Sequence, residues 1–350
     1  MQGLQLADYD FDLPESRIAQ QPLADRAASK LLLLAADGQI HDLQFRDIVT
    51  LLRPGDVLVM NDTRVTARRL FGRKIRAGAP DGAAIEALLL HRTSERTYEA
   101  LVRPAKRLDV GAAIQFDLGL TAEVVDSTAT GGRVLRFSGD TDPGPIIEER
   151  GEVPLPPYIR EALADPERYQ TVYRRDHAEM TGSAAAPTAG LHFTPELLDQ
   201  LDAMGVQRTT VTLDVGIDTF RPVNVDDVAT HTMHGETCRI SEAAAEVING
   251  RRGRLIAVGT TSVRTLESFA RDDRTVSAGF TKTQIFLYPG VPFRCVDGMF
   301  TNFHLPRTTM LMMIAALAGY EPIMSAYRHA LTYDYRFLSF GDSMLILAKA

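Results

Sequence analysis

The class of fold is decided by the stretch LIAVGTTSVRTLESFA, residues 255–270. Its first four residues form an apolar run typical of a buried strand, and the polar loop 259–262 follows at once. Apolar residues then recur at helical spacing, at Val263, Leu266, Phe269 and Ala270. A strand, a polar loop and an amphipathic helix in this order are typical of helices packed on a largely parallel sheet. The stretch therefore predicts an α/β main domain with a mostly parallel or mixed sheet.

Segments on both sides of this unit continue the alternation of helix and strand. Thr194 and Pro195 are suited to the N-cap and first position of a helix, which Gly205 ends. The strand after it alternates apolar and polar residues, which directs Asp214 away from the apolar row. We also predict strands at residues 57–60 and 345–347, a hairpin at 30–43, and a buried helix at 310–318, a run about half as long as a bilayer span.

Residues 65–150 have a different texture, with short alternating runs separated by Gly and Asp. Such closely spaced strands are typical of an antiparallel barrel or sandwich. We expect an inserted β-barrel-like domain at residues 65–150, within a discontinuous α/β catalytic domain formed by residues 1–64 and 151–350. The proline-rich segment 154–158 marks the predicted boundary, because proline continues neither a helix nor a central strand.

Charge and cysteine content exclude some classes of protein. With 350 residues, 45% of them hydrophobic, and a net charge of −7, the chain is globular and unsuited to coating nucleic acid indiscriminately, which needs clustered cations. Local basic patches remain. Two widely spaced cysteines indicate neither a disulfide framework nor a thiolate metal site. Because no secretory signal is evident at the N-terminus, we expect a cytoplasmic protein.

The stretch GSAAAPTAGLHF, residues 182–193, is the first candidate for a ligand site. It is nearly uncharged, and its one imidazole belongs to His192. Glycine near both ends and a proline between them let the backbone approach a ligand closely. The same composition also suits a loop that packs under a core element, so the residues alone leave both interpretations open.

Polar residues at strand ends are further candidates. Asn61, Thr63 and Arg64 follow the predicted strand 57–60. The loop 259–262 is suited to an anion or a sugar at a helix N-terminus, although simple N-capping by Thr or Ser explains it equally well. It lacks the spacing of dinucleotide-binding and triphosphate-binding loops. His304 and Arg307 are suited to a ligand carboxylate or phosphate, while a structural role is commoner for a lone histidine before a helix.

The run THTMHGETC, residues 230–238, gathers two imidazoles, a carboxylate and a thiol. Its spacing matches no familiar zinc signature, so a metal-free polar pocket or histidines satisfied in the core are favoured over a metal. Two other functions are open: a hydrolase based on Ser183, although no Gly-x-Ser-x-Gly elbow is present, and an RNA-binding module without chemistry. The acidic balance and the His, Asp and Glu in loops favour an enzyme.

Six motifs in one order resemble the family of S-adenosylmethionine:tRNA ribosyltransferase-isomerases of queuosine biosynthesis. They are RIAQQP (17–22), NDTRV (61–65), ALVRPAKR (100–107), AAPTAGLHF (185–193), VGTTSVR (258–264) and NFHLP (302–306). The resemblance extends through nearly the whole chain. Departures are minor: Ala184, Gly235 and Phe340 stand where the family usually has Val, Ser and Tyr, and only Gly235, beside the histidines, is expected to affect function, modestly.

The resemblance implies that the ribosyl part of S-adenosylmethionine is transferred and isomerised onto 7-aminomethyl-7-deazaguanine at the wobble position of tRNA. The products would be epoxyqueuosine in tRNA, adenine and methionine. The sulfonium acidifies the adjacent C5′ hydrogen, so the reaction needs a general base, a donor for the leaving adenine and an aligned neutral amine. S-adenosylmethionine is then a substrate, no permanently bound cofactor or metal is implied, and a monomer without membrane contact is expected.

The resemblance also suggests roles for the candidate residues. We expect His192 to be the base or acid, with His231, His234 and His304 in reserve and Asp214 and Glu236 orienting them. The backbone that cradles adenosine or the target base is expected at Ala185, Ala186, Pro187, Thr188, Ala189 and Gly190. Ribose hydroxyls or the methionine carboxylate are expected at Gly259, Thr260, Thr261 and Ser262, with further substrate contacts at Arg264, Asn61, Thr63 and Arg64. Phosphates of tRNA are expected at Arg68, Arg69, Arg103, Lys106 and Arg107.

Overall fold

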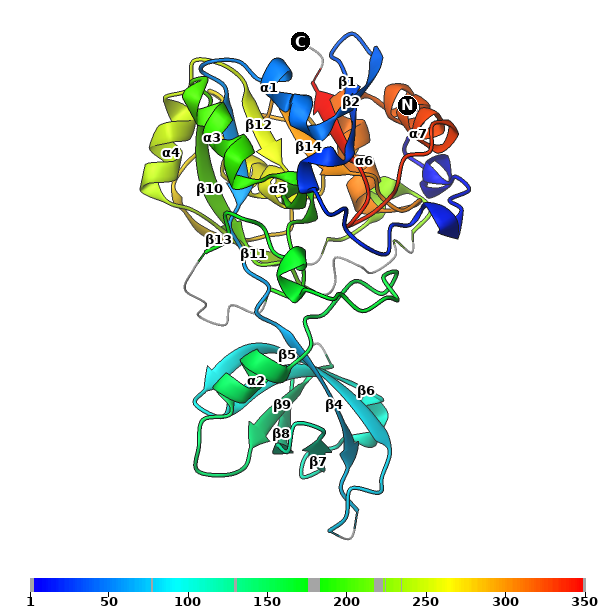
Figure 1. The fold of residues 1–350 in the computed structure, drawn as a ribbon, viewed down its shortest axis with the longest axis vertical. Helices are drawn as coiled ribbons and strands as arrows, with labels where there is room; N and C mark the ends of the chain where they lie inside the picture. The colour runs from blue at the N-terminus through cyan, green and yellow to red at the C-terminus, as the bar shows by residue number, and fades with distance from the viewer. Residues whose placement is uncertain are drawn as a thin grey trace.

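The computed structural model of the protein describes residues 3–76, 78–128, 131–175, 183–216, 223, 225–233 and 235–348. Figure 1 shows two parts, a broad sheet covered by helices and a small barrel below it. The chain enters the barrel after β3 (Val57–Asn61) and leaves it through α2 (Gly144–Arg150). The predicted fold class is confirmed, whereas the division into domains at residues 64/65 and 150/151 stays a prediction.

A nine-stranded sheet with the order β13-β11-β10-β3-β12-β14-β15-β1-β2 forms the centre of the larger part. Strands β10, β3, β12 and β14 run parallel to one another, and so do β15 and β1. The remaining neighbours are antiparallel, including the predicted hairpin of β1 and β2. The other bounds are β1 Lys30–Leu34, β2 Ile40–Gln44, β10 Gln207–Leu213, β11 Glu236–Ile240, β12 Leu255–Val258, β13 Gly279–Thr283, β14 Gly298–Asn302 and β15 Ser343–Leu347.

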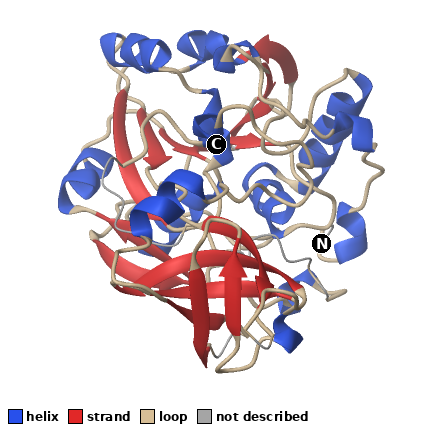
Figure 2. Ribbon diagram, turned by 60° about the horizontal axis from the view of Figure 1, so that its bottom comes forward, coloured by secondary structure: helices blue, strands red, loops and turns tan. Residues whose placement is uncertain are grey.

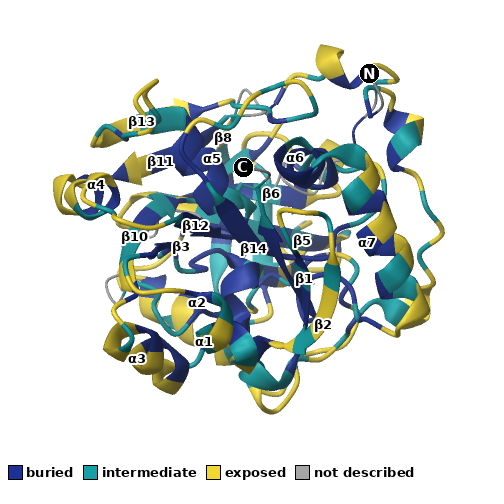
Figure 3. Ribbon diagram, turned by 90° about the horizontal axis from the view of Figure 1, so that it is seen from above, coloured by how far each residue is buried: buried dark blue, intermediate teal, exposed yellow. Residues whose placement is uncertain are grey.

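Helices cover both faces of this sheet, because successive residues of a buried strand point to opposite sides. On β3, Val57 and Val59 pack with α4 (Glu242–Asn249), α5 (Thr260–Phe269), α6 (Thr309–Ala318) and α7 (Tyr320–Thr332). Leu58 and Met60 of the same strand pack with α1 (Ile48–Leu51) and α3 (Pro195–Ala203). Figure 3 shows the buried residues concentrated in the central strands and the inner faces of these helices.

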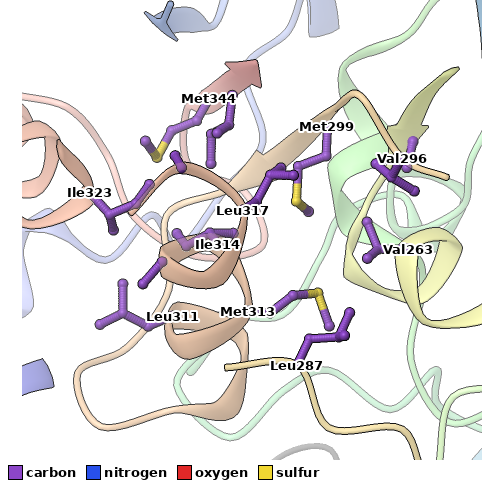
Figure 4. Close-up of a cluster of buried hydrophobic side chains, with 14 of the residues drawn as sticks. Val263, Leu287, Val296, Met299, Leu311, Met313, Ile314, Leu317, Ile323 and Met344 are labelled. Carbon is purple, nitrogen blue, oxygen red and sulfur yellow. The ribbon is translucent and has the colours of Figure 1, made fainter. Parts of the chain in front are cut away.

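Helix α6 confirms the prediction of a buried apolar helix. In Figure 4 Leu317 of this helix lies beside Met299 of β14, and Leu311 and Ile314 belong to the same buried cluster as Met299 and Met344 of β15. Among the described residues, no single helix has the length and apolar character to cross a membrane. Helices α6 and α7 have the required length and apolar character only when taken together, and the chain bends by 117° between them.

The smaller part is a closed antiparallel barrel with the order β4-β5-β6-β9-β8-β7. Its interior is filled by alternating residues, such as Tyr98, Ala100 and Val102 of β6, whose neighbours are half-buried. Figure 2 brings the barrel toward the viewer. The strands are β4 Arg68–Lys74, β5 Ala84–Ser94, β6 Thr97–Arg103, β7 Ala113–Phe116, β8 Thr121–Ser127 and β9 Arg133–Phe137.

Two predicted helix starts have different outcomes. Thr194 caps α3 as predicted, because its hydroxyl accepts a hydrogen bond from the Leu197 N–H at 3.2 Å. The helix α5 starts at Thr260 rather than near Val263, so the predicted loop 259–262 is in fact an N-cap and a first turn. Its N-cap is Gly259, with a φ of 87° and no side-chain cap. The alternative of capping by Thr or Ser was therefore wrong.

Candidate active site

The parallel strands bring the predicted site segments to one edge of the sheet. Strands β3, β12 and β14 end at Asn61, Val258 and Asn302, and β10 ends at Leu213, two residues before Val215. Because these four strands run in the same direction, their carboxyl ends meet at the edge where open α/β sheets bind ligands. The segments after β3, β12 and β14 are those that carry the predicted polar motifs.

A cavity of about 480 Å³ opens at this edge. Its walls come from residues 185–189, 259–261 and 301–310, with Val215 beside them. Tyr158, Tyr169 and Ser339 complete the polar part of the lining, while Leu6 and Val223 are apolar contributors. The volume lies in the range that drug-sized ligands occupy in proteins. Five of the six predicted cradle residues, Ala185 to Ala189, therefore line one cavity together with Gly259, Thr260 and Thr261.

The small-residue loop is held by the Ser183 hydroxyl and by hydrogen bonds to the backbone of Val215. The Ser183 hydroxyl donates to the Ala185 carbonyl at 3.1 Å and accepts from the Val215 N–H at 3.2 Å. The Ala184 N–H donates to the Val215 carbonyl at 2.9 Å. Ser183 is fully buried and does not line the cavity, so its position gives no support to a serine hydrolase. With these bonds made, the loop presents Ala185 and its neighbours as a wall almost without side chains.

Gly190 is required by packing rather than by a ligand. A Cβ atom at this position would overlap the hydroxyl of Tyr173. Gly190 is also not part of the cavity lining. At this one residue the packing interpretation of the stretch accounts for the glycine, while residues 185–189 fit the ligand interpretation.

His192 lies behind the cavity wall. It is 5% exposed, its Nδ1 bonds to the Ser29 hydroxyl at 2.8 Å, and its Nε2 bonds to the Asn302 amide nitrogen at 3.3 Å. Burial, with Arg336 and Arg26 adding repulsion, lowers the pKa of His192 to about 3, so the ring is neutral at neutral pH. Asn302 in turn accepts from the Thr188 hydroxyl at 2.9 Å. His192 thus reaches the cavity only through Asn302 and Thr188, and its role as base stays a prediction.

His304 is the described histidine that lines the cavity. Its Nε2 bonds to the Thr301 hydroxyl at 2.7 Å, and its main-chain N–H donates to the Tyr327 hydroxyl at 2.8 Å. Burial lowers the pKa of His304 to about 3, so this imidazole is also neutral. A ring fixed by Thr301 can donate or accept one hydrogen bond to a substrate through Nδ1 without changing its charge.

A second polar group stands behind the wall formed by Thr261. Asn61 is fully buried, and its amide donates to the Leu213 carbonyl at 2.9 Å and to the Thr261 hydroxyl at 3.1 Å. Its carbonyl oxygen accepts from the N–H groups of Thr63 and Leu213 at 3.1 and 3.0 Å. Asn61 therefore orients Thr261 and does not itself line the cavity.

Thr63, Asp214 and Arg175 continue this network outward. The Thr63 hydroxyl donates to Asp214 at 2.7 Å, and Arg175 reaches Asp214 at 3.4 Å. Arg175 also pairs with Asp62 at 3.4 Å. None of these residues lines the cavity, and neither does the half-buried Arg64.

The residues predicted around the histidine cluster are only partly brought together. Glu236 and Arg264 form a buried ion pair beside Gly216, whose N–H donates to Glu236 at 3.0 Å. Burial lowers the pKa of Arg264 to about 10, so it remains charged at neutral pH. His231 packs edge-on against Phe286, with ring centres 5.2 Å apart. His234 lies outside the described residues.

The same cluster shows no feature of a metal centre in the part of the chain that the structure describes, where no three His, Cys, Asp or Glu side chains are grouped to hold an ion. Burial raises the pKa of Cys238 to about 11, so its side chain is a neutral thiol at neutral pH. Ser262 is fully buried and points away from the cavity, because its hydroxyl donates to the Val258 carbonyl at 2.7 Å.

The basic residues predicted for tRNA divide into two groups. Arg68 and Arg69 are half-buried and already contact other parts of the protein: Arg68 bonds to the carbonyls of Val65 and Ala67, and Arg69 pairs with Glu86 at 3.0 Å. The exposed group lies at the end of β6 and in the segment after it, and consists of Arg103, Lys106 and Arg107. Exposure therefore favours this group over Arg68 and Arg69 for phosphate binding, and the tRNA-binding role of all five residues stays a prediction.

Tyr158, Tyr169 and Ser339 are among the residues that line the cavity and were not predicted. Tyr158 closes the proline-rich segment that we interpreted as a boundary, and its hydroxyl lies 2.7 Å from the Ser339 hydroxyl. Burial raises the pKa of Tyr158 to about 12. Tyr169 is fully buried on the same side. The prolines before Tyr158 restrict their own φ and the residue before each of them, so they indicated a boundary but not the direction of the Tyr158 side chain.

Comparisons with known proteins agree with one another. A family model described as "Queuosine biosynthesis protein" matches residues 6–346. Two relatives named S-adenosylmethionine:tRNA ribosyltransferase-isomerase come from Symbiobacterium thermophilum and Desulforamulus reducens; they are 51% and 48% identical, each over 98% of this chain and 100% of the relative. A crystal structure of S-adenosylmethionine tRNA ribosyltransferase from Thermotoga maritima has a TM-score of 0.55 and 36% identity, covering 97% of this chain and 100% of that chain.

Proposed function

The chain belongs to the queuosine biosynthesis family of S-adenosylmethionine:tRNA ribosyltransferase-isomerases, and from this premise we propose its substrates and products. It transfers and isomerises the ribosyl part of S-adenosylmethionine onto 7-aminomethyl-7-deazaguanine at the wobble position of tRNA. The products are epoxyqueuosine in tRNA, adenine and methionine. In this reaction S-adenosylmethionine is consumed as a substrate.

One observation carries the proposal: the cavity of about 480 Å³ at the carboxyl ends of the parallel strands. Its wall of residues 185–189 has little beyond backbone and Cβ atoms, which suits the flat face of a nucleobase. The polar part of the lining includes the hydroxyls of Thr188, Thr260 and Thr261, which can hydrogen bond to the hydroxyls of a ribose. A nucleoside-sized ligand therefore matches both the volume and the distribution of polar groups.

The histidines take separate roles in this proposal. His304 touches the substrate, because it lines the cavity and its Nδ1 is not the atom bonded to Thr301. Because its pKa is lowered to about 3, the neutral ring is a weak base, and it is the candidate for hydrogen bonding to the leaving adenine rather than for accepting the C5′ proton. His192 positions Asn302, and through it Thr188, so we assign it an indirect effect on catalysis.

The tRNA substrate is placed against the barrel. Arg103, Lys106 and Arg107 are exposed together after β6, and their charges complement the phosphate backbone.

The deciding assay incubates the purified protein with S-adenosylmethionine and tRNA that carries 7-aminomethyl-7-deazaguanine, and measures free adenine and methionine. Both products are expected in equal amounts, and only with the modified tRNA. The same tRNA with unmodified guanine is the control. Hydrolysis of esters or amides without S-adenosylmethionine, or tight tRNA binding without product, would overturn the proposal in favour of a hydrolase or a passive binding module.

The residue assignment is tested by His304→Gln, with His329→Gln as a matched control on the half-exposed face of α7, where His329 bonds to Asp42 at 2.9 Å. We expect adenine release to fall at least about 100-fold in His304→Gln, within the usual range for general acid–base groups, and to stay unchanged in the control. If the two variants are equally active, His304 takes no part in the reaction.

A further inference from the structure

The cavity carries almost no charge of its own. Among the described residues that line it, Arg307 is the one with a formal charge, because His304 is held neutral by burial. Arg307 lies where the segment after β14 turns into α6. The ligand proposed above has three charges near one end: an α-carboxylate, an α-ammonium and a sulfonium. The position of Arg307 therefore bears on how that ligand is oriented.

Arg307 is paired at the rim with an acidic residue from a distant part of the chain. Its Nε lies 3.2 Å from the Asp10 carboxylate, and each of the two side chains is 52% exposed. A guanidinium has five N–H donors, so one bond to Asp10 leaves its outer edge available to a second anion. The pair offers one positive and one negative group side by side at the mouth of the cavity.

Both partners are held in place by the backbone. The Arg307 N–H donates to the Tyr9 carbonyl at 3.1 Å, which fastens the segment that carries Asp10 to the cavity rim. That segment is anchored again where the Tyr320 hydroxyl donates to the Asp8 carbonyl at 2.7 Å. Leu6, in the same segment, lines the cavity. Asp10 therefore occupies a fixed place beside the opening, although it is far from Arg307 in sequence.

The backbone of Arg307 is also strained. Its φ is 60°, in the left-handed region that residues other than Gly, Asn and Asp rarely adopt. An arginine persists in such a conformation when the surrounding structure enforces it, and residues of this kind cluster at ligand sites. An asparagine would fit the same backbone with less strain, so the fold alone does not account for an arginine at this position.

We propose that Arg307 and Asp10 bind the amino-acid end of S-adenosylmethionine, with the guanidinium taking the α-carboxylate and the Asp10 carboxylate taking the α-ammonium. This rests on the function proposed above. It fixes the direction of the substrate: the methionine end lies at the rim, the ribose lies near Thr260 and Thr261, and the adenine lies along residues 185–189. Residues 259–261 are thereby left to the ribose hydroxyls and not to the carboxylate.

The test compares S-adenosylmethionine with decarboxylated S-adenosylmethionine, which keeps the ammonium and the sulfonium but lacks the carboxylate. The wild-type protein is expected to discriminate against the decarboxylated compound. In Arg307→Asn, KM for S-adenosylmethionine should rise about 10- to 100-fold, which corresponds to one lost charge-assisted hydrogen-bond pair. KM for the decarboxylated compound and for tRNA should change by no more than about twofold, and the discrimination should disappear.

Two further variants separate the site from general effects. Asp10→Asn should raise KM for both compounds, since both carry the ammonium. Arg328→Gln, an exposed arginine of α7 away from the cavity, should change neither. The melting temperature of Arg307→Asn should not fall, because asparagine tolerates the positive φ.

The outcomes distinguish this inference from the function on which it rests. If Arg307→Asn still prefers S-adenosylmethionine as strongly as the wild-type protein does, the inference is overturned while the function stands. If the wild-type protein releases no adenine from S-adenosylmethionine with the modified tRNA, the proposed function itself is wrong.

Discussion

Two buried neutral histidines make the stability of this protein sensitive to mild acid. The pKa values of His192 and His304 are lowered to about 3, because burial disfavours the charged ring. In the unfolded chain a histidine titrates near 6.5, so acidification protonates the unfolded state first. Stability from these residues is therefore complete above about pH 6.5 and is lost as the pH falls toward 3.

The magnitude follows from the two pKa values. At pH 5 each histidine lowers the free energy of unfolding by about 2 kcal/mol, so the pair lowers it by about 4 kcal/mol. That is a large share of the roughly 5–15 kcal/mol by which domains are stable. Asp62 and Asp342 act in the opposite direction, since burial raises their pKa values and the folded state then binds protons more readily in acid.

Urea unfolding at pH 7.5 and pH 5.0 measures this effect. In the wild-type protein the free energy of unfolding should be lower at pH 5.0 than at pH 7.5. This difference should be about 2 kcal/mol smaller in each of the single variants His192→Asn and His304→Asn, because asparagine does not titrate. His41→Asn, at an exposed position of β2, is the control and should leave the loss unchanged. The reasoning fails if either core variant loses as much stability on acidification as the wild-type protein, since that histidine would then be protonated in the folded state.

Three further predictions concern the cavity wall and the barrel. Thr188→Val leaves the Asn302 carbonyl oxygen without its donor and should lower kcat/KM for adenine release about 10-fold, whereas Thr188→Ser should retain most of it. Gly190→Ala should destabilise the fold by about 1–3 kcal/mol in urea unfolding through overlap with Tyr173, and Tyr173→Phe should recover part of that loss. Replacing the exposed barrel residues Arg103, Lys106 and Arg107 by glutamine should reduce the salt dependence of tRNA binding by up to three phosphate contacts, without changing KM for S-adenosylmethionine. If the logarithm of the tRNA affinity falls with salt concentration as steeply in this variant as in the wild-type protein, these residues do not contact tRNA.

Much of the fold was predictable because its signals are local. The strand-helix unit at residues 255–270 and the capped helix after Thr194 follow from periodicity and end residues. The strands of the barrel follow from alternating runs and turn residues. The order of the nine-stranded sheet was not predictable, because the pairing of β3 with both β10 and β12 joins segments about 150 to 200 residues apart.

The site was predictable in its segments but not in the direction of its side chains. Residues 185–189 and 259–261 were selected from composition and resemblance, and the structure brings both to one cavity. His192 was favoured because it is the titratable group of its stretch, yet the turn of residues 188–192 directs it toward Ser29. The direction of the His192 side chain depends on one turn of 3₁₀ helix, which a sequence pattern does not specify.

The connection between the barrel and the cavity wall shows why the two parts can serve one reaction. The N–H groups of Thr66 and Ala67, where the chain enters the barrel, both donate to the Ser183 carbonyl at 3.2 Å. Ser183 in turn holds the wall through Ala185 and Val215. In the proposed function, tRNA binds the barrel and S-adenosylmethionine binds against the wall, so these backbone bonds lie between the two binding sites. If the binding of one substrate shifts this junction and thereby changes the affinity for the other, linkage requires the effect to be equal in both directions.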